Sequence, residues 1–383
     1  MLVLHTSDWH LGRSFHGADL TGAQAAVLDH LVDVVREERV GLVLIAGDLY
    51  DRALPPVSAV ELWGDTAERL VDAGAQVVVV SGNHDSARRL GGGAGLLERA
   101  GVHIRTDPSR AADPVLLDLD GAALAVYPIP YLEPSVAADL VEGARPTHAT
   151  VLRAAAERCR FDLAGRSGVR GIAVAHAFVA GGEECASERA LTVGGAAQVS
   201  AGTFAGFDYV ALGHLHGRQV LGEGQLRYSG SPLAYSFSEE RHHKGAWLLD
   251  IGTDGVRRVH EVDLPVPRRL ARLRGTLEDL LAAPVYSEVE GSWVSVTLTD
   301  TRCPAGAMPR LQRRFPHAVE LTWEPAGGVV DLTGSYTARV AQRDDLEVVG
   351  EFVRHVRNTP ADAEEATVLH DAVEAATRTP VEV

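Results

Sequence analysis

The sequence predicts an α/β fold in which sheets of buried strands are flanked by helices. Short apolar runs alternate with amphipathic stretches along the first half of the chain, and their spacing suits strand–helix–strand units. Turn residues follow most of the apolar runs, as expected where a buried strand ends. The runs predicted to be strands are residues 2–4, 42–45, 77–80, 172–175 and 209–212, with 246–249 as a closing strand.

Two helices are predicted between the first three strands. In residues 24–38, the apolar side chains recur at the helical period and fall on one face. A second helix is expected after Pro55 and Pro56 and should end near Ala73 and Gly74, because proline favours the first turn and glycine the end of a helix.

The pattern changes near residues 263–267, where two prolines lead out of the sheet region and mark a domain boundary. Residues 1–262 are therefore predicted to be one domain. Residues 263–328 read as a small α+β module, with strands expected at 270–273, 293–298 and 318–323 and helices at 276–281 and 308–315. Residues 329–383 are expected to hold a linker and two helices, at 346–356 and 361–376.

The charge balance argues against a protein that grips nucleic acid by itself. The 383 residues carry 36 Lys and Arg against 52 Asp and Glu, a net charge of −16, and Lys244 is the only lysine. A polyanionic substrate would then be held locally or with help, although acidity also serves plain solubility. Three scattered cysteines and no apolar run long enough to span a bilayer predict a cytoplasmic protein without membrane insertion.

Five polar motifs, each placed directly after an apolar run, offer a set of metal ligands. The carboxyl ends of sheet strands share an edge, so loops from distant parts of the chain can meet there. Carboxylates, a carboxamide and imidazoles without a thiolate suit two manganese, iron or zinc ions rather than a structural zinc site. The predicted ligands are Asp8, His10, Asp48, Asn83, His176, His214 and His216.

The spacing also predicts how these ligands are presented. Asp8 and His10 lie two residues apart, and in an extended exit from the first strand both side chains would point the same way, as would His214 and His216. Asp48 is best placed to bridge two ions roughly 3.5–4 Å apart, with a shared water acidified into the nucleophile. Two divalent ions and two carboxylates leave a formal charge near +2, which would attract a phosphodiester.

Further residues near these motifs have candidate roles. His84 is predicted to donate a proton to the leaving group or to steady its charge, as the catalytic histidine. Asp85 is expected to orient that ring or to cap the turn, and Asp51 to hold the loop or contact substrate. Arg13 is a candidate phosphate contact, with a surface role as the alternative.

Each motif also has an ordinary structural interpretation. Asp8 with His10 could be turn chemistry, Asp48 could cap a helix, and a lone histidine such as His176 is more often a packed residue than a ligand. The order and combination of the motifs favour the metal centre. The remaining histidines are expected to be surface or packing residues.

At these positions the chain resembles the SbcD family, the bacterial nuclease subunit with archaeal and eukaryotic relatives in double-strand-break processing. The resemblance is strong to about residue 262 and weaker beyond, and Asp51 departs from those relatives, which tend to carry histidine there. It rests on LHTSDWHLGR (4–13), GDLYD (47–51), GNHD (82–85), His176, SER (187–189), GHLH (213–216), RYSGSPL (227–233) and SFSEE (236–240).

The resemblance implies a metallophosphoesterase sandwich with two manganese ions. One ion would lie on Asp8, His10, Asp48 and His216, and the other on Asp48, Asn83, His176 and His214. It further implies exonuclease action on duplex ends and endonuclease action on single strands and hairpins, in DNA repair, recombination and replication. A homodimer within a heterotetramer with the SMC-like ATPase SbcC is implied too, with the module 263–328 capping the DNA site and the C-terminal segment binding the ATPase.

Two other functions fit the same ligands. A phosphodiesterase or phosphatase for small nucleotides or phosphoproteins would share every ligand, but it would leave residues 263–383 unexplained. A non-catalytic scaffold on the same fold is the usual outcome when such proteins lose ligands, and here no ligand is missing.

Overall fold

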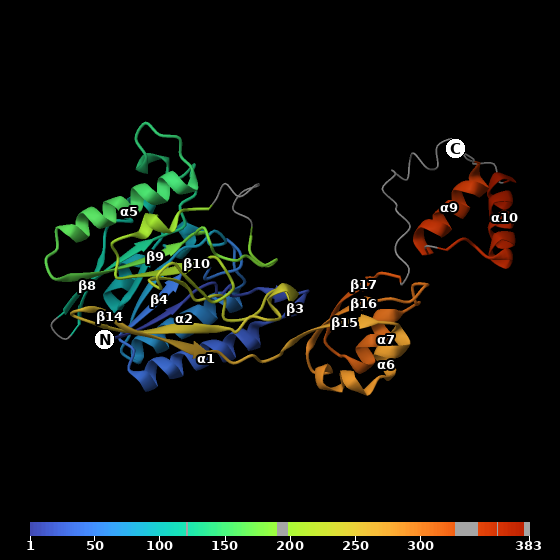
Figure 1. Cartoon of the computed structure of the whole chain (residues 1–383), viewed down its shortest axis with the longest axis horizontal. Helices are drawn as coiled ribbons and strands as arrows, with labels where there is room; N and C mark the ends of the chain where they lie inside the picture. The colour runs from blue at the N-terminus through green and yellow to red at the C-terminus, as the bar shows by residue number, and fades with distance from the viewer. Residues whose placement is uncertain (120–121, 190–197, 326–343, 358, 379–383) are drawn as a thin grey trace. The chain divides into compact units, whose positions relative to one another are not determined.

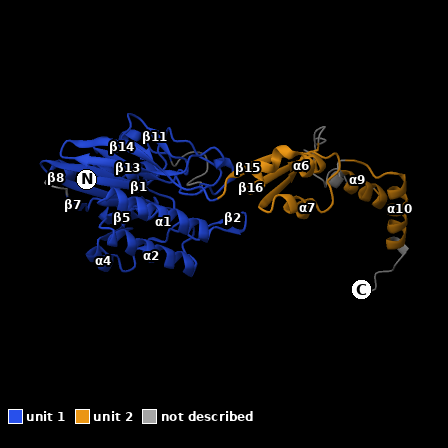
Figure 2. Cartoon of the chain, turned by 90° about the horizontal axis from the view of Figure 1, so that it is seen from below, with its two compact units in different colours: residues 1–267 blue, residues 268–383 orange. Residues whose placement is uncertain are grey.

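The computed structural model describes residues 1–119, 122–189, 198–325, 344–357 and 359–378. The chain forms two compact units, Met1–Pro267 and Arg268–Val383 (Figure 2). The predicted linker begins at residue 329, and its residues 329–343 lie outside the described part of the chain.

The first unit is built on two six-stranded sheets (Figure 1). In the first sheet β1, β4, β5 and β6 run parallel, while β13 pairs antiparallel with β1 and β14 antiparallel with β13. Its strand order is β14 (Gly255–Asp263), β13 (Gly245–Gly252), β1 (Leu2–Thr6), β4 (Leu42–Ala46), β5 (Gln76–Val80) and β6 (Val102–Arg105).

The second sheet has a parallel centre and antiparallel edges. Strands β8, β9, β10 and β12 run parallel, and β7 and β11 close the two edges in the antiparallel sense. Its order is β11 (Gln219–Leu221), β12 (Leu226–Tyr228), β10 (Tyr209–Gly213), β9 (Val169–His176), β8 (Ala122–Ile129) and β7 (Val115–Leu119).

Helices cover the outer faces of both sheets, which gives four layers. Helices α1 (Thr21–Glu38) and α2 (Val57–Asp72) lie against the first sheet, as Figure 2 shows, and α5 (His148–Ala164) packs on the second. Shorter elements are β2 (Ser14–Phe15), β3 (Ala18–Asp19), α3 (Ala87–Leu90), α4 (Ala94–Leu97) and the 3₁₀ turns Glu98–Ala100, Pro108–Arg110, Ala138–Leu140, Ala201–Phe204 and Phe237–Glu239.

A continuous apolar core joins the facing sides of the two sheets. Leu44 and Val78 of the first sheet belong to the same buried cluster as Val126 and Val174 of the second. The two sheets lie close together where β4 and β10 end, since a Cβ on Gly213 would stand 1.9 Å from the carbonyl oxygen of Ala46. Any larger residue there would push the sheets apart at the edge that carries the polar motifs.

The second unit has its own small core. Strands β15 (Leu270–Gly275), β16 (Trp293–Leu298) and β17 (Ala318–Trp323) form a parallel sheet. Helices α6 (Leu277–Ala282) and α7 (Ala307–Arg314) pack on it around Leu280, Leu311 and Phe315, and a 3₁₀ segment spans Pro284–Val289. Two further helices, α9 (Asp345–Arg357) and α10 (Ala363–Arg378), pack against each other.

The predicted fold class is confirmed, and each predicted strand and helix overlaps an observed one. Sequence reasoning did not predict α5, because its buried side chains are mostly small, such as Ala155, Ala156 and Cys159, and give only a weak helical stripe. It also missed β6, β7, β8 and β14. None of the helices in the described part of the chain combines the length and the apolar character needed to cross a bilayer.

Candidate two-metal site

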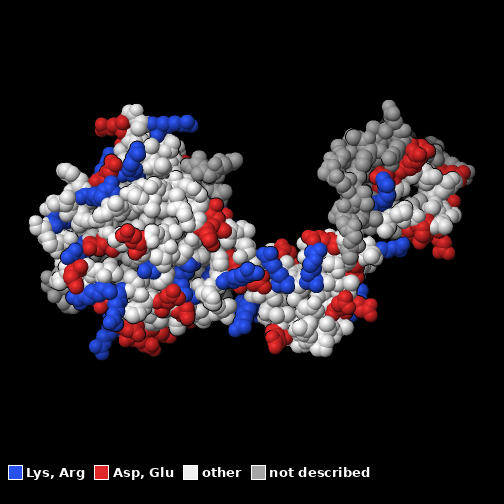
Figure 3. Space-filling model, in the orientation of Figure 1, with Lys and Arg blue, Asp and Glu red and all other residues white. Residues whose placement is uncertain are grey.

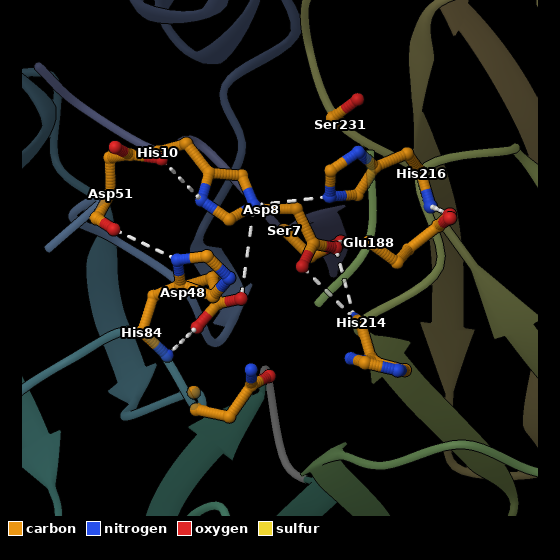
Figure 4. Close-up of polar contacts among 12 residues, drawn as sticks. Ser7, Asp8, His10, Asp48, Asp51, His84, Glu188, His214, His216 and Ser231 are labelled. Atoms are coloured by element: carbon orange, nitrogen blue, oxygen red, sulfur yellow. Dashed lines mark hydrogen bonds and ion pairs between the residues drawn. The ribbon is translucent and has the colours of Figure 1, made fainter. Parts of the chain in front are cut away.

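The seven predicted ligands come together at one edge of the first unit. Those that follow β1, β4 and β5 meet those that end β9 or follow β10, so both sheets contribute. Figure 4 shows five of the seven: Asp8, His10, Asp48, His214 and His216. Ligand atoms of Asp8, His10 and His216 lie within 4.8 Å of one another, as do those of Asp8, Asp48 and His176. Asn83 joins them through Oδ1, which lies 2.9 Å from Nε2 of His176.

The backbone at the ligands is strained rather than extended. Asp8, His10, Asp48 and His214 have φ values of 54°, 45°, 48° and 107°. The expected extended exit from the first strand is therefore wrong. Two loops run side by side instead, because the Asp8 and His10 amides donate to the carbonyl oxygens of Gly47 and Asp48 at 3.0 and 2.9 Å. Such conformations cost about 1–3 kcal/mol each and concentrate at functional sites.

Acceptor atoms face one another in a way that suits bound cations. Nδ1 of His176 donates to the Ala46 carbonyl oxygen at 3.0 Å, so its Nε2 lone pair faces the Asn83 oxygen. Nε2 of His10 and Nε2 of His216 are likewise 3.0 Å apart. Two lone pairs this close repel each other, and a cation held by both atoms would remove that repulsion. The spacing therefore fits a shared metal ion.

One unpartnered ring nitrogen supports the same interpretation. Nε2 of His214 is buried without a hydrogen-bond partner among the described residues. An unsatisfied buried polar atom is costly, and a metal ion would satisfy the His214 nitrogen. The backbone of His214 is held in place, because its amide donates to both carboxylate oxygens of Asp8 at 3.0 and 3.1 Å.

The electrostatics of the site favour cations. Burial, and then the charge of Asp48, raises the pKa of Asp8 well above its ordinary value. Burial lowers the pKa of His10, His176 and His214, so these imidazoles are neutral, which is the form that binds metal. Bound divalent cations would hold these buried carboxylates in their charged form, and the residues present fit two such ions.

Gly82 is required by a close approach at this site. A Cβ placed there would stand 2.1 Å from Oδ1 of Asp48 and 2.4 Å from its backbone nitrogen. The loop after β5 can therefore lie against the loop after β4 only if residue 82 has no side chain. That contact also lets the His84 amide donate to Oδ1 of Asp48 at 2.8 Å.

Gly82→Ala should lower stability by about 1–3 kcal/mol through overpacking and should weaken metal binding by displacing Asp48. Gly64→Ala is the matched control, because a Cβ there meets nothing within 4 Å and alanine favours the helix by roughly 1 kcal/mol. Thermal unfolding without Mn²⁺ measures the stability of each variant, and the additional stabilisation in Mn²⁺ measures its metal binding. Equal metal-induced stabilisation in the two variants would contradict the close-approach argument.

The supporting residues take specific places around the ligands. Nδ1 of His84 lies 2.8 Å from the Asp51 carbonyl oxygen, and its ring meets that of His10 edge-on at 4.7 Å. Asp85 caps the turn, since its carboxylate accepts from the backbone amides of residues 49, 50 and 82. Burial, and then the charge of Asp48, raises the pKa of Asp85 to about 7.

Arg13 and Asp51 face each other beside the ligands. Nη2 of Arg13 donates to the Ser187 carbonyl oxygen at 2.9 Å, and its guanidinium lies over the Tyr235 ring. The Asp51 carboxylate lies 3.6 Å from Nε of Arg13 and 3.7 Å from Nδ1 of His10. Both residues therefore brace the loop that carries His10, and Arg13 is engaged with the protein itself.

Sequence reasoning missed the residues that brace the ligands through hydrogen bonds. Gln24 donates to the His10 carbonyl oxygen at 2.8 Å, and Glu188 accepts from the His216 amide at 2.7 Å. Glu239 and Lys244 are charged yet almost fully buried. The one available signal was Lys244, since a single lysine in a chain rich in arginine suggests a site that needs an ammonium group.

Comparison with known families agrees with this geometry. Residues 1–124 match the family model of the calcineurin-like phosphoesterases. This part of the first unit is therefore similar to calcineurin-like phosphoesterase domains. Residues 266–357 match a second family, SbcD_C, described as the type 5 capsule protein repressor C-terminal domain. The first match indicates metal-dependent hydrolysis of phosphoesters, and the second supports an SbcD-like assignment of residues 266–357.

Solved structures show similarity at low sequence identity. The protein TT1561 of Thermus thermophilus is 14% identical, with a TM-score of 0.39, over 68% of this chain and 98% of that one. GAP50, the anchor in the inner membrane complex of Plasmodium, is 12% identical, with a TM-score of 0.37, over 86% of this chain and 98% of that one.

Proposed function

We propose that this protein is the nuclease subunit of a DNA-processing complex and hydrolyses phosphodiester bonds with two divalent metal ions, manganese first among them. One observation carries the proposal: the phosphoesterase domain with its full ligand set occurs in the same chain as an SbcD C-terminal domain. The substrates would be duplex ends, single strands and hairpins, and the pathways would be DNA repair, recombination and replication.

The protein's own residues would arrange the reaction. When bound, two divalent ions acidify water for attack on phosphorus and offset the charge that develops on the phosphate oxygens. Asp8, His10, Asp48 and His216 would hold one ion, and Asp48, Asn83, His176 and His214 the other. Asp48 is suited to both sets, with Oδ2 3.8 Å from Nε2 of His10 and 3.5 Å from Nε2 of His176.

His84 is the proposed catalytic residue. Its Nδ1 faces a carbonyl oxygen, which only accepts, so Nδ1 carries a proton and the neutral ring keeps its lone pair on Nε2. A second proton on Nε2 makes the imidazolium, which can donate to the leaving alkoxide or steady its charge. The Asp51 carbonyl oxygen thereby fixes which nitrogen serves the substrate.

The surface charge supports the proposal that this protein binds DNA together with a partner subunit. Acidic and basic side chains are interspersed over the face of the first unit seen in Figure 3, and the whole chain has a net charge of −16. A protein that binds DNA alone usually presents a continuous basic surface. We therefore propose that an SMC-like ATPase subunit, SbcC, shares the binding, with this chain as a homodimer within a heterotetramer.

The second unit would provide the remaining contacts. The small sheet of β15, β16 and β17 with α6 and α7 is the proposed DNA-capping module. Helices α9 and α10, which follow it, are the proposed binding segment for the ATPase. Removing residues 344–383 should then abolish the effect of the ATPase while leaving the intrinsic cleavage of short substrates.

The decisive experiment is cleavage of end-labelled duplex and hairpin DNA in Mn²⁺, by this chain alone and with its ATPase partner. We expect manganese-dependent cleavage of both, and stimulation by the ATPase. Hydrolysis of small phosphodiesters far faster than DNA would favour the nucleotide phosphodiesterase instead. One ion or none per chain at manganese saturation, without cleavage, would favour a non-catalytic scaffold.

A further inference from the structure

A buried chain of polar groups leads from His216 to the only lysine of the protein. Nε2 of His216 faces the other ligands, whereas Nδ1 lies 2.7 Å from Oγ of Ser187. That hydroxyl lies 2.6 Å from Oε1 of Glu239, and Oε2 of Glu239 lies 2.5 Å from Nζ of Lys244. All four residues are at least 93% buried, so water does not compete for these bonds.

Lys244 ends this series of hydrogen bonds, and its three partners fix its protonation state. Its Nζ contacts three groups: the His216 carbonyl oxygen at 2.9 Å, Oγ of Ser231 at 2.9 Å and Oε2 of Glu239. The Ser231 hydroxyl uses its own proton on the Leu233 carbonyl oxygen at 2.7 Å, so it accepts from Lys244. All three partners are acceptors, and only an ammonium group supplies three protons. The Glu239 carboxylate is then the counter-ion of a buried cation.

The direction of the remaining bonds follows from the protonation state of Lys244. An ionised Glu239 carboxylate can only accept, so the Ser187 hydroxyl donates its one proton to Oε1. Having no second proton, Ser187 must accept from Nδ1 of His216. Nδ1 therefore carries the proton of the neutral ring, and the lone pair lies on Nε2, which points at the metal site.

We propose that Ser187, Glu239 and Lys244 form a positioning relay that holds His216 in its Nδ1–H tautomer, ready to bind metal through Nε2. The inference rests on His216 being a metal ligand, as proposed above. None of the three relay residues touches the reacting groups. They act through His216, by removing the tautomer in which Nε2 would carry a proton and could not bind an ion.

The backbone of His216 is held by the same network. Lys244 binds its carbonyl oxygen, and Oε1 of Glu188 accepts from its amide at 2.7 Å. The relay thus fixes both the ring and the main chain of one ligand, with Ser187 and Glu188 adjacent in a single loop. An ordinary buried ion pair would stabilise the fold without controlling a tautomer, so the test must read the tautomer itself.

The first measurement needs no variant. Long-range ¹⁵N–¹H NMR of the metal-free, full-length protein labelled at histidine should show His216 protonated on Nδ1 and not on Nε2. Assignment by His216→Gln removes one ring system from the spectrum. A proton on Nε2 of His216 in the wild-type protein would overturn the proposal, whatever the variants do.

Ser187→Ala then removes the acceptor for Nδ1–H. We expect a mixture of His216 tautomers and a 10–100-fold weaker Mn²⁺ affinity at one of two sites, measured by calorimetry. Ser109→Ala is the matched control, because this exposed hydroxyl binds only Asp107. Ser187→Thr, which keeps the hydroxyl, should restore both readouts. An unchanged tautomer and affinity in folded Ser187→Ala would refute the relay.

If Ser187→Ala does not fold, the NMR measurement on the wild-type protein still decides the proposal, because a proton on Nε2 of His216 contradicts it without any variant.

None of these readouts uses DNA. A protein with the expected tautomer that does not cut DNA would refute the nuclease and leave the relay standing. A protein that cuts DNA with the other tautomer would refute the relay alone.

Discussion

His84→Ala should lower manganese-dependent DNA cleavage by about 10²–10⁴-fold while both metal ions remain bound, because general acid–base catalysis contributes rate of that order. The ring lies beside His10 but has its own anchor on the Asp51 carbonyl oxygen, so its loss leaves the ligand loops in place. Cleavage of end-labelled duplex DNA gives the rate, and elemental analysis gives the metal content.

His260→Ala is the control for this experiment. His260 is exposed on β14, and its replacement by alanine should change neither the cleavage rate nor the metal content. Two outcomes would remove His84 from the mechanism: cleavage at the wild-type rate, or a loss of rate fully explained by a loss of metal. Retained metal with slow cleavage separates a catalytic histidine from a ligand.

Asp48→Asn should have the larger effect on the metal centre. The amide keeps an oxygen for the His84 amide bond at 2.8 Å, so the loop stays folded, but it removes the charge that can hold two ions. We expect metal content to fall from two ions per chain to one or none. Cleavage should fall by at least about 10³-fold, the equivalent of several kcal/mol of lost charge stabilisation.

The sign of the stability change gives a second readout for Asp48→Asn. In the metal-free protein burial, and after it the charge of Asp48, raises the pKa of Asp8, and the second cause is repulsion between the two carboxylates. Metal-free Asp48→Asn should therefore be at least as stable as the wild type. Manganese at 100 times its dissociation constant should stabilise the wild type by about 2.7 kcal/mol per site, and the variant by less.

Asp33→Asn, on the exposed face of α1, controls for charge alone. Thermal scans with a chelator give the stability of the metal-free protein, and scans in manganese give the stabilisation by the metal. A variant that binds two ions and gains as much stability from manganese as the wild type would show that Asp48 does not bridge.

The sequence was most informative where apolar runs end in polar residues. Leu42–Ala46 and Tyr209–Gly213 are fully buried strands, and their continuous apolar pattern predicted each strand and the position of the candidate ligand that follows it. The division of these strands between two sheets could not be predicted from their pattern, because a buried strand looks alike in either sheet.

The detailed shape of the site depends on contacts between distant residues. The left-handed backbone at Asp8 and His10 arises from hydrogen bonds to the loop after β4, and side-chain alternation cannot reveal it. The bond between Ser187 and Glu239 joins positions 52 residues apart. A motif search finds each of these residues but not the direction in which a proton lies between them.

The origin of the ligands from two sheets has a consequence for unfolding. Asp8 and His10 follow β1 of one sheet, and His214 and His216 follow β10 of the other. Asp8 and His214 are 206 positions apart in the sequence. An ion held by both groups closes that long loop as a reversible cross-link. The sheets could then separate only after the ion dissociates. The bound metal should therefore hold the two sheets together and slow unfolding.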